Sequence, residues 1–155
     1  YKCAVLHNTV WDLGTNVRTW EGDLARKLAR WSRAARASST QLFWMELHEL
    51  HPQRQGCQSD SKCRSVWKDR DPAVVRLFRT AAARLARQHG IELVPMLDLT
   101  NNSAAAADGA DAVHYGPNTT RLEAERLAHA LHQKGCLWPE QHQTVSLSLP
   151  ETPFL

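Results

Sequence analysis

The stretch DAVHYGPN, residues 111–118, combines a carboxylate and an imidazole at a spacing that suits acid–base chemistry. Asp111 precedes His114 by three positions. An imidazole that takes a proton from a hydroxyl needs its second ring nitrogen held by a carboxylate, which fixes the tautomer and stabilises the imidazolium. A short D-x-x-H match also occurs in ordinary turns, where the Asp caps the turn and the His lies on the surface. The position of the pair in the fold therefore decides between a catalytic pair and a turn.

Three short apolar runs alternate with helical patterns along the chain, and this order predicts an α/β fold. We expect strands at about 3–7, 41–47 and 91–97, helices at about 23–36, 72–89 and 120–132, and a loop of small residues at about 98–110. Such alternation favours a parallel sheet with right-handed crossovers and helices on its faces, which is a three-layer sandwich.

Polar residues follow each of the three predicted strands. In parallel sheets, functional groups gather beyond the carboxyl ends of the strands. The three loops in question place Asn8, His48 and the Asp111–His114 pair at one edge of the sheet. This placement favours the catalytic interpretation of DAVHYGPN.

The predicted helices have one apolar face and one basic face. The buried face of the first helix is expected to comprise Leu24, Leu28, Trp31 and Ala35. The solvent-exposed face of the second is expected to comprise Arg76, Arg79, Arg84 and Arg87. The net charge of +3 at pH 7 is too small to indicate a nucleic-acid partner. No apolar run approaches the length of a membrane span, so none is predicted in these residues.

Four cysteines and two N-glycosylation sequons favour a secretory or extracellular location. The sequons begin at Asn101 and Asn118. Cys57 and Cys63 lie in an aperiodic insertion at about 49–71, and we expect them to form a disulfide that closes a small loop. The two remaining cysteines, Cys3 and Cys136, can pair with each other or with cysteines outside this chain.

A zinc site is the weaker alternative for the insertion. Two imidazoles and two thiolates are ligands that hold zinc tetrahedrally. The residues that could supply them are His48, His51, Cys57 and Cys63. Their spacing matches no common zinc finger, so we predict no metal and no cofactor.

The block DAVHY, with the helical pattern after it, resembles the C-terminal catalytic block of the SGNH (GDSL-type) hydrolases. The stretch AVLHNTVWDLG resembles the strand and loop of the PC-esterase branch, in which an Asn at the strand end precedes a WDL element. The stretches QLFWMELHELHP and LVPMLDLTNN are similar to the family's next two strands, and the resemblance extends from Cys3 to about Leu131. It implies His114 as the general base, Asp111 as its orienting partner and Asn8 as an oxyanion-hole donor.

One part of the family pattern does not occur in these residues. The family's nucleophilic serine lies in a Gly-Asp-Ser turn, and the chain has neither Gly-Asp-Ser nor a G-x-S-x-G elbow. Neither Ser59, in the insertion, nor Ser103, in an alanine-rich stretch, is a credible nucleophile. The resemblance therefore implies that residues 1–136 are the C-terminal part of an SGNH-like domain, followed by an irregular tail at 137–155. Alone, such a part is expected to be inactive.

The implied chemistry is ester hydrolysis, or acyl transfer onto or off a hydroxyl, with a glycan or another O-acylated molecule as substrate. The serine would come from the missing N-terminal half of the domain, on the same or a separate chain, because the family's serine block lies upstream of the Asn block. The start at Tyr1, directly before a strand, also leads us to expect a processed or truncated parent. Trp11, in the loop after the first strand, is a candidate for lining the substrate pocket. The alternative is a catalytically inactive SGNH-like module with a structural or interaction role in a larger assembly.

Overall fold

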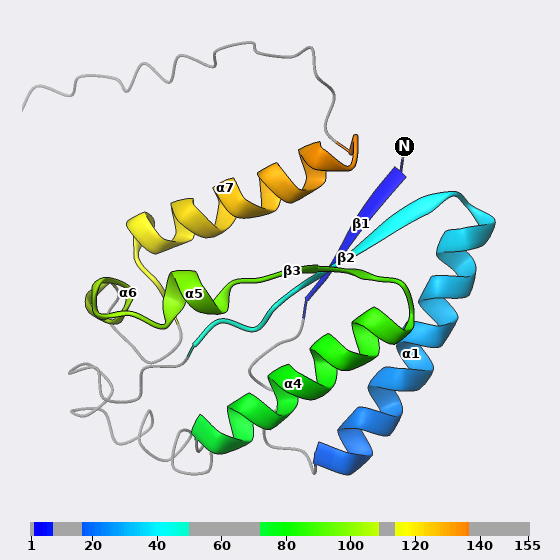
Figure 1. The fold of residues 1–155 in the computed structure, drawn as a ribbon, viewed down its shortest axis with the longest axis horizontal. Coiled ribbons are helices and arrows are strands. Elements are labelled where there is room, and N and C mark those ends of the chain that lie inside the picture. Colours follow the sequence, from blue (N-terminus) through cyan, green and yellow to red (C-terminus); the bar gives the residue numbers. More distant parts are fainter. Residues whose placement is uncertain (1, 8–16, 50–71, 109–113, 137–155) are drawn as a thin grey trace, which may run out of the picture.

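The computed structural model describes residues 2–7, 17–49, 72–108 and 114–136, and within them it has a parallel sheet between layers of helices (Figure 1). The strands are β1 (Lys2–His7), β2 (Thr40–Met45) and β3 (Glu92–Val94). The helices are α1 (Val17–Ala37), α4 (Pro72–Gln88), α5 (Leu97–Thr100), α6 (Ser103–Ala107) and α7 (Pro117–Gln133). The strand order is β1-β2-β3, with both pairings parallel. Helices α1 and α4 lie on one side of the sheet and α7 on the other, which confirms the predicted α/β fold.

The central strand β2 supplies side chains to the cores on both faces of the sheet. Leu42 and Trp44 belong to the core shared with α1 and α4, where Phe78 is fully buried. Phe43 belongs to the opposite core, with Val94 of β3 and residues of α7. Because side chains alternate between the faces of a strand, a short run that is apolar throughout is buried on both sides.

Helix α1 begins at Val17, several residues before the start near residue 23 that the pattern predicts. A glycine at position 22 weakens the intrinsic helix propensity of this first part. The packing of Trp20 outweighs that weakness, because the side chain is only 7% exposed and its ring centroid lies 4.5 Å from that of Phe78 on α4. Tertiary packing thus extends the helix beyond its amphipathic signal.

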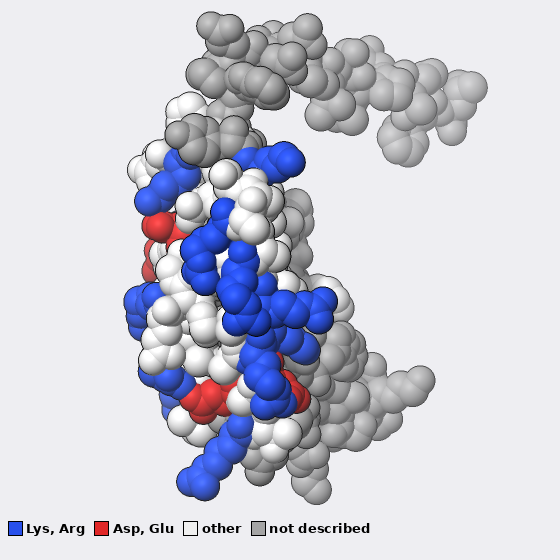
Figure 2. Space-filling view, turned by 90° about the vertical axis from the view of Figure 1, so that its right-hand side faces the viewer, with Lys and Arg blue, Asp and Glu red and all other residues white. Residues whose placement is uncertain are grey.

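The outer face of α1 is basic, and one aromatic side chain lies on it. Leu24, Leu28 and Ala35 are buried as predicted, whereas the prediction for Trp31 is wrong, because that residue is 37% exposed. Viewed from the side of α1, Lys and Arg side chains form a band along the molecule (Figure 2).

The chain after β3 does not continue as a strand, and the predicted strand at 91–97 is too long. Strand β3 ends at Val94, and the segment expected to be a loop contains α5 and α6. The carboxylate of Glu46 accepts hydrogen bonds from the backbone N–H groups of Met96 and Leu97, both at 3.0 Å. A carboxylate at a helix N-terminus satisfies donors that have no partner within the helix and interacts favourably with the helix dipole. These two hydrogen bonds stabilise the start of α5 directly after β3.

Helix α7 begins at Pro117, three residues before the predicted start, and a remote carboxylate caps it. Asp108 accepts the backbone N–H of Thr119 at 2.6 Å, and its carbonyl accepts the N–H of Gly116 at 2.9 Å. A Cβ atom on Gly116 would collide with the Asp108 carboxylate, so the close approach requires glycine. Farther along the helix, Arg126 bonds to the carboxylate of Asp98 in α5, which holds the pKa of that carboxyl below its ordinary value.

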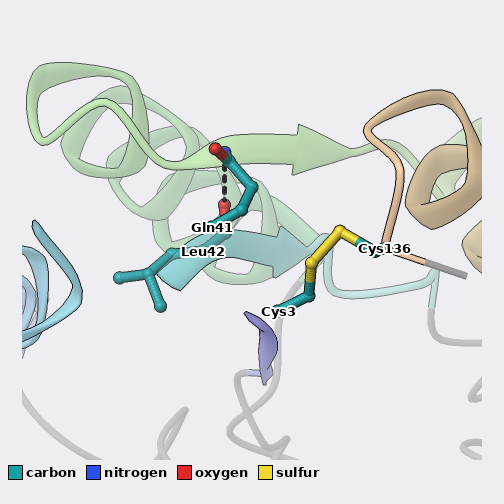
Figure 3. The surroundings of a disulfide bond; sticks show 4 residues. All are labelled: Cys3, Gln41, Leu42 and Cys136. Carbon is teal, nitrogen blue, oxygen red and sulfur yellow. Dashed lines mark hydrogen bonds between the residues drawn. A yellow bond between two sulfur atoms is a disulfide. The ribbon is translucent and has the colours of Figure 1, made fainter. Parts of the chain in front are cut away.

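A disulfide joins the start of β1 to the residues just after α7 (Figure 3). Of the two pairings that the sequence left open, the structure has Cys3 bonded to Cys136, with the Cα atoms 5.8 Å apart. Cys3 lies beside Gln41 of β2 in the sheet register. The bond therefore fastens the end of α7 to the edge strand of the described sheet.

The insertion at about 49–71 and the tail at 137–155 remain predictions, because residues 50–71 and 137–155 lie outside the described residues. The same holds for the Cys57–Cys63 pairing and for the zinc alternative with His51. In the described part of the chain, no group of three or more potential metal ligands occurs. Within that same part, no helix is long and apolar enough to cross a bilayer.

Replacing both Cys3 and Cys136 by serine is expected to lower the free energy of unfolding by several kcal/mol. The two cysteines are 133 positions apart, and closing a loop of that size removes about 5 kcal/mol of entropy from the unfolded state in the chain-entropy description. Urea denaturation of the wild type and the double variant measures the difference. Equal unfolding midpoints with equal slopes would contradict a stabilising role for the bond.

Candidate active site

The segment after β2, residues 46–49, lies at the carboxyl edge of the sheet and is held by a buried arginine. Arg79 of α4 is only 6% exposed. Its guanidinium donates to the carbonyl oxygens of Leu47 at 2.9 Å and His48 at 3.2 Å, and to the carboxylate of Glu49 at 3.3 Å. The expectation that Arg79 lies on a solvated face is therefore wrong. A buried guanidinium is stable only with such partners, so it determines where this segment runs.

Two more side chains hold the backbone of Glu49. The hydroxyl of Thr100, which is fully buried, accepts the N–H of Glu49 at 2.9 Å and donates to the carbonyl of Met96 at 3.0 Å. The hydroxyl of Tyr115 donates to the Glu49 carbonyl at 2.7 Å. The segment after β2, the end of α5 and the segment before α7 are thus joined at Glu49.

An imidazole and a carboxylate meet beside this junction. The Nδ1 atom of His48 lies 3.4 Å from Oε1 of Glu123 on α7, and the two side chains are 20% and 16% exposed. The buried Glu123 Oε1 has no partner with hydrogen-bond geometry among the described residues, so the contact is a close approach that is an ion pair only when the imidazole is protonated, and not a formed hydrogen bond. The rings of His48 and Tyr115 pack edge to face, with centroids 5.1 Å apart. The His48 ring is therefore held beside Glu123 by packing against Tyr115 and not by a hydrogen bond to the carboxylate.

A second histidine, His7, lies at the carboxyl end of β1. Burial is the main cause that lowers the pKa of the His7 imidazole below the ordinary value of 6.5, and the electrostatic influence of His48 lowers this pKa further. A backbone hydrogen bond to Met45 and the charge of Glu123 act in the opposite direction. Part of the His7 side chain is still accessible to solvent. The three groups His7, His48 and Glu123 thus influence one another at the edge where the sequence predicts the site.

The structure describes only one member of the predicted catalytic pair. His114 is exposed and lies one residue before Tyr115, whose hydroxyl is bound to the segment after β2. Asp111, Asn8 and Trp11 lie outside the described residues, and their roles stay predictions. Both sequon asparagines are exposed: Asn101 follows α5 and Asn118 lies in the first turn of α7.

The sequence pattern gives no site role to three residues that shape this edge: Arg79, which it assigns to the solvent-exposed face, and Tyr115 and Glu123, which it does not single out. A signal for Arg79 was present, because it lies one helical turn from both Val75 and Ala83, which are buried. Glu123 lies in a helix rich in charged residues, and nothing in its spacing distinguishes it. Its role depends on the approach of α7 to β2, which is a tertiary contact.

The chemistry available at this edge is proton transfer. The imidazoles of His7 and His48 and the carboxylate of Glu123 lie close enough at the ends of β1 and β2 to influence one another, and Arg79 holds the segment after β2 in place. Imidazoles at the carboxyl edge of a parallel sheet are suited to general acid–base catalysis.

The comparisons with known proteins find similarity among solved structures. No protein-family model matches the chain, and no curated protein matches it. Among solved structures, the chain is similar to a protein from Parabacteroides merdae described as a GDSL-like lipase, with a TM-score of 0.56 and 21% identity. The match covers 86% of this chain and 61% of that one, so the chain spans about three fifths of the relative's length. At this identity the similarity establishes that the two proteins share a fold, and it establishes neither the family nor the reaction.

Replacing Arg79 by Met is expected to destabilise the fold by about 3 kcal/mol or more, because it leaves the Glu49 carboxylate and two backbone carbonyls without their donor. Arg79→Lys keeps the charge and loses the planar set of donors, so it should lie between the wild type and Arg79→Met. Urea denaturation gives the free energies. A matched control is the exposed Arg76→Met, which should stay within about 0.5 kcal/mol of the wild type. Equal effects at the two positions would exclude the anchoring role.

Acidification is expected to weaken the fold through His7. Because the pKa of His7 is lower in the folded than in the unfolded protein, the stability it contributes is present above pH 6.5 and is lost as the pH falls through the folded-state pKa. The His7→Gln variant should lose less stability than the wild type between neutral pH and about pH 5. Unfolding free energies measured across this range test the difference. A steeper loss in the variant would show the opposite sign of the shift.

Proposed function

We propose that this chain is the C-terminal part of an SGNH-type serine hydrolase domain of the PC-esterase kind, which cleaves or transfers O-acyl groups. The observation that carries the proposal is the position of His114: it lies three residues before α7 and next to Tyr115, whose hydroxyl bonds to Glu49 beyond the carboxyl end of β2, in a fold shared with a GDSL-like lipase. In this proposal His114 is the general base, Asp111 orients it, and Asn8 donates to the oxyanion.

The reaction proceeds by nucleophilic catalysis with a serine from a segment outside these 155 residues. The His114 imidazole takes the proton of the serine hydroxyl as the oxygen attacks the acyl carbon, and the carbonyl oxygen becomes the oxyanion held by Asn8. The tetrahedral intermediate then expels the alcohol, which receives the proton from His114. Attack of water on the acyl-enzyme gives hydrolysis, and attack of another hydroxyl gives transfer.

The open side of β1 supports a further strand supplied by that segment. In the described sheet β1 pairs only with β2, so the other side of its backbone has no strand partner there. Val5, on the face that α7 covers in part, is 39% exposed. Parallel strands with apolar sequences usually lie inside a sheet with both faces covered.

In this proposal, Tyr115 and Arg79 position the backbone beside His114. Tyr115 holds the backbone next to His114 against Glu49, and Arg79 holds Glu49 in turn. An imidazole must lie within hydrogen-bond reach of the hydroxyl that it deprotonates. Anchoring the adjacent residue restricts where the His114 ring can lie.

The disulfide between Cys3 and Cys136 supports a secretory or extracellular location, since such bonds persist in oxidising compartments. The substrate class that fits this location is an O-acylated glycan or a similar ester. The PC-esterase assignment, the location and the substrate all belong to the proposal.

The test is labelling of the full-length protein by a fluorophosphonate probe, which modifies activated serines. The wild type should be labelled, and His114→Ala should lower the labelling rate by about 10²–10⁴-fold, because removing a general base costs that much. The control His129→Ala, an exposed histidine on α7, should be labelled like the wild type.

Absence of labelling in the wild type would exclude the serine-hydrolase proposal and favour an inactive SGNH-like module in a larger assembly. Equal labelling of His114→Ala and wild type would exclude His114 as the base. The residues preceding Tyr1 are expected to include a Gly-Asp-Ser turn, and a full-length sequence without it would contradict the proposal as well.

A further inference from the structure

The exposed face of α1 carries a line of positive charges. Arg26, Arg30 and Arg33 follow one another at helical spacing, so they lie along one side of the helix within about 10 Å of axis. Lys27 extends the line sideways, and all four side chains are exposed. Figure 2 shows the resulting band of Lys and Arg.

Few carboxylates balance this line. Helix α1 contains two acidic residues, Glu21 and Asp23, and both already have arginine partners: Glu21 pairs with Arg84 of α4 and Asp23 with Arg26. No carboxylate in the described part of the chain forms a salt bridge with Lys27, Arg30 or Arg33. A helix face that served only for solubility would be expected to intersperse both signs of charge. The potential on this side is therefore positive.

An aromatic ring lies inside the charged line. Trp31 is 37% exposed, whereas Trp20 on the same helix is 7% exposed. A depression of about 320 Å³ on the surface is lined by Arg26, Lys27, Arg30 and Trp31. Leaving a tryptophan side chain in water forgoes the stabilisation of burial, so its partial exposure beside three cations is a feature of a binding surface.

We propose that this face, the Arg26–Arg33 face with Trp31, binds an acidic polysaccharide that carries sulfate or carboxylate groups. Guanidinium groups bind such oxyanions with paired, charge-assisted hydrogen bonds. The flat indole of Trp31 offers an apolar surface with one polar atom, which suits contact with the C–H face of a sugar ring.

Other polyanions fit the observations less well. Nucleic acids are also basic-patch ligands that stack on aromatic rings, but the Cys3–Cys136 disulfide favours an oxidising compartment, where acidic glycans are abundant. A membrane surface would require a broad apolar face beneath the charges, and the exposed side of α1 offers only Trp31 and alanines. The proposal does not depend on the proposed hydrolase, because α1 lies on the opposite side of the sheet from α7.

The test measures binding of the full-length protein to heparin, a sulfated polysaccharide, as a function of salt. The wild type should bind at about 0.15 M salt, and Arg30→Gln/Arg33→Gln should bind roughly tenfold or more weakly. The slope of log affinity against log salt should become shallower by about 2, because two fewer contacts release counterions. The control Arg121→Gln/Lys134→Gln removes two exposed cations at α7 and its end, and it should bind like the wild type.

Trp31→Ala separates ring stacking from simple charge attraction. It should weaken binding of a heparin oligosaccharide several-fold while the salt slope stays unchanged, because no ion pair is lost. Circular dichroism and urea denaturation of each variant identify any loss of folding. Failure of the wild type to bind heparin, or equal weakening by both double variants, would overturn the proposal. Tighter binding to polyuridylate or to phosphatidylserine vesicles than to heparin would overturn the choice of a polysaccharide.

Discussion

The buried guanidinium of Arg79 is the constraint on which the rest of the candidate site depends. A charge removed from water must be surrounded by acceptors, and this one finds two backbone carbonyls and a carboxylate within residues 47–49. The segment after β2 therefore cannot move without leaving the charge unpaired. Because Tyr115 and Thr100 bond to the same Glu49, the position of the loop is transmitted to α5 and to the start of α7.

Helix α7 is fastened at both ends, so a second element at the carboxyl edge, besides the segment after β2, is held in place. Asp108 caps its first turn, and the Cys3–Cys136 disulfide attaches the residues beyond its last turn to β1. Glu123 lies between these two attachments and faces His48. The two anchors hold the helix that carries Glu123, and Arg79 holds the segment that carries His48, so the 3.4 Å approach of the two side chains rests on these attachments.

The features of the fold and site that the sequence predicts correctly are those that depend on local interactions along the chain. The three strands, the two long amphipathic helices and the carboxyl-edge position of His48 depend on periodicity and chain order, which are visible in the sequence. Helix α5 was missed because its N-terminus is capped by Glu46, which is remote in sequence. Arg79 was assigned to a solvent-exposed face because helical spacing shows which residues share a face, but not which segment packs against that face. The Cys3–Cys136 pairing could not be predicted because it depends on the approach of the end of α7 to β1, which is a tertiary contact. The roles of Asp111 and Asn8 stay predictions, because these residues lie outside the described ones.

One feature of β1 connects the sheet to the proposed chemistry. Its sequence CAVLH is apolar on both faces, which is the composition of an interior strand, yet in the described sheet it has a single neighbour and Val5 is 39% exposed. An unpaired strand edge of this kind invites pairing with another segment, and soluble proteins usually cover or charge such edges. Under the proposed function, one additional segment would explain two gaps together. It would cover the edge of β1 and bring a serine to the end of the sheet where His7 and His48 lie and where Tyr115, the neighbour of His114, is anchored to Glu49. A purely structural module would need a partner only for the first of these.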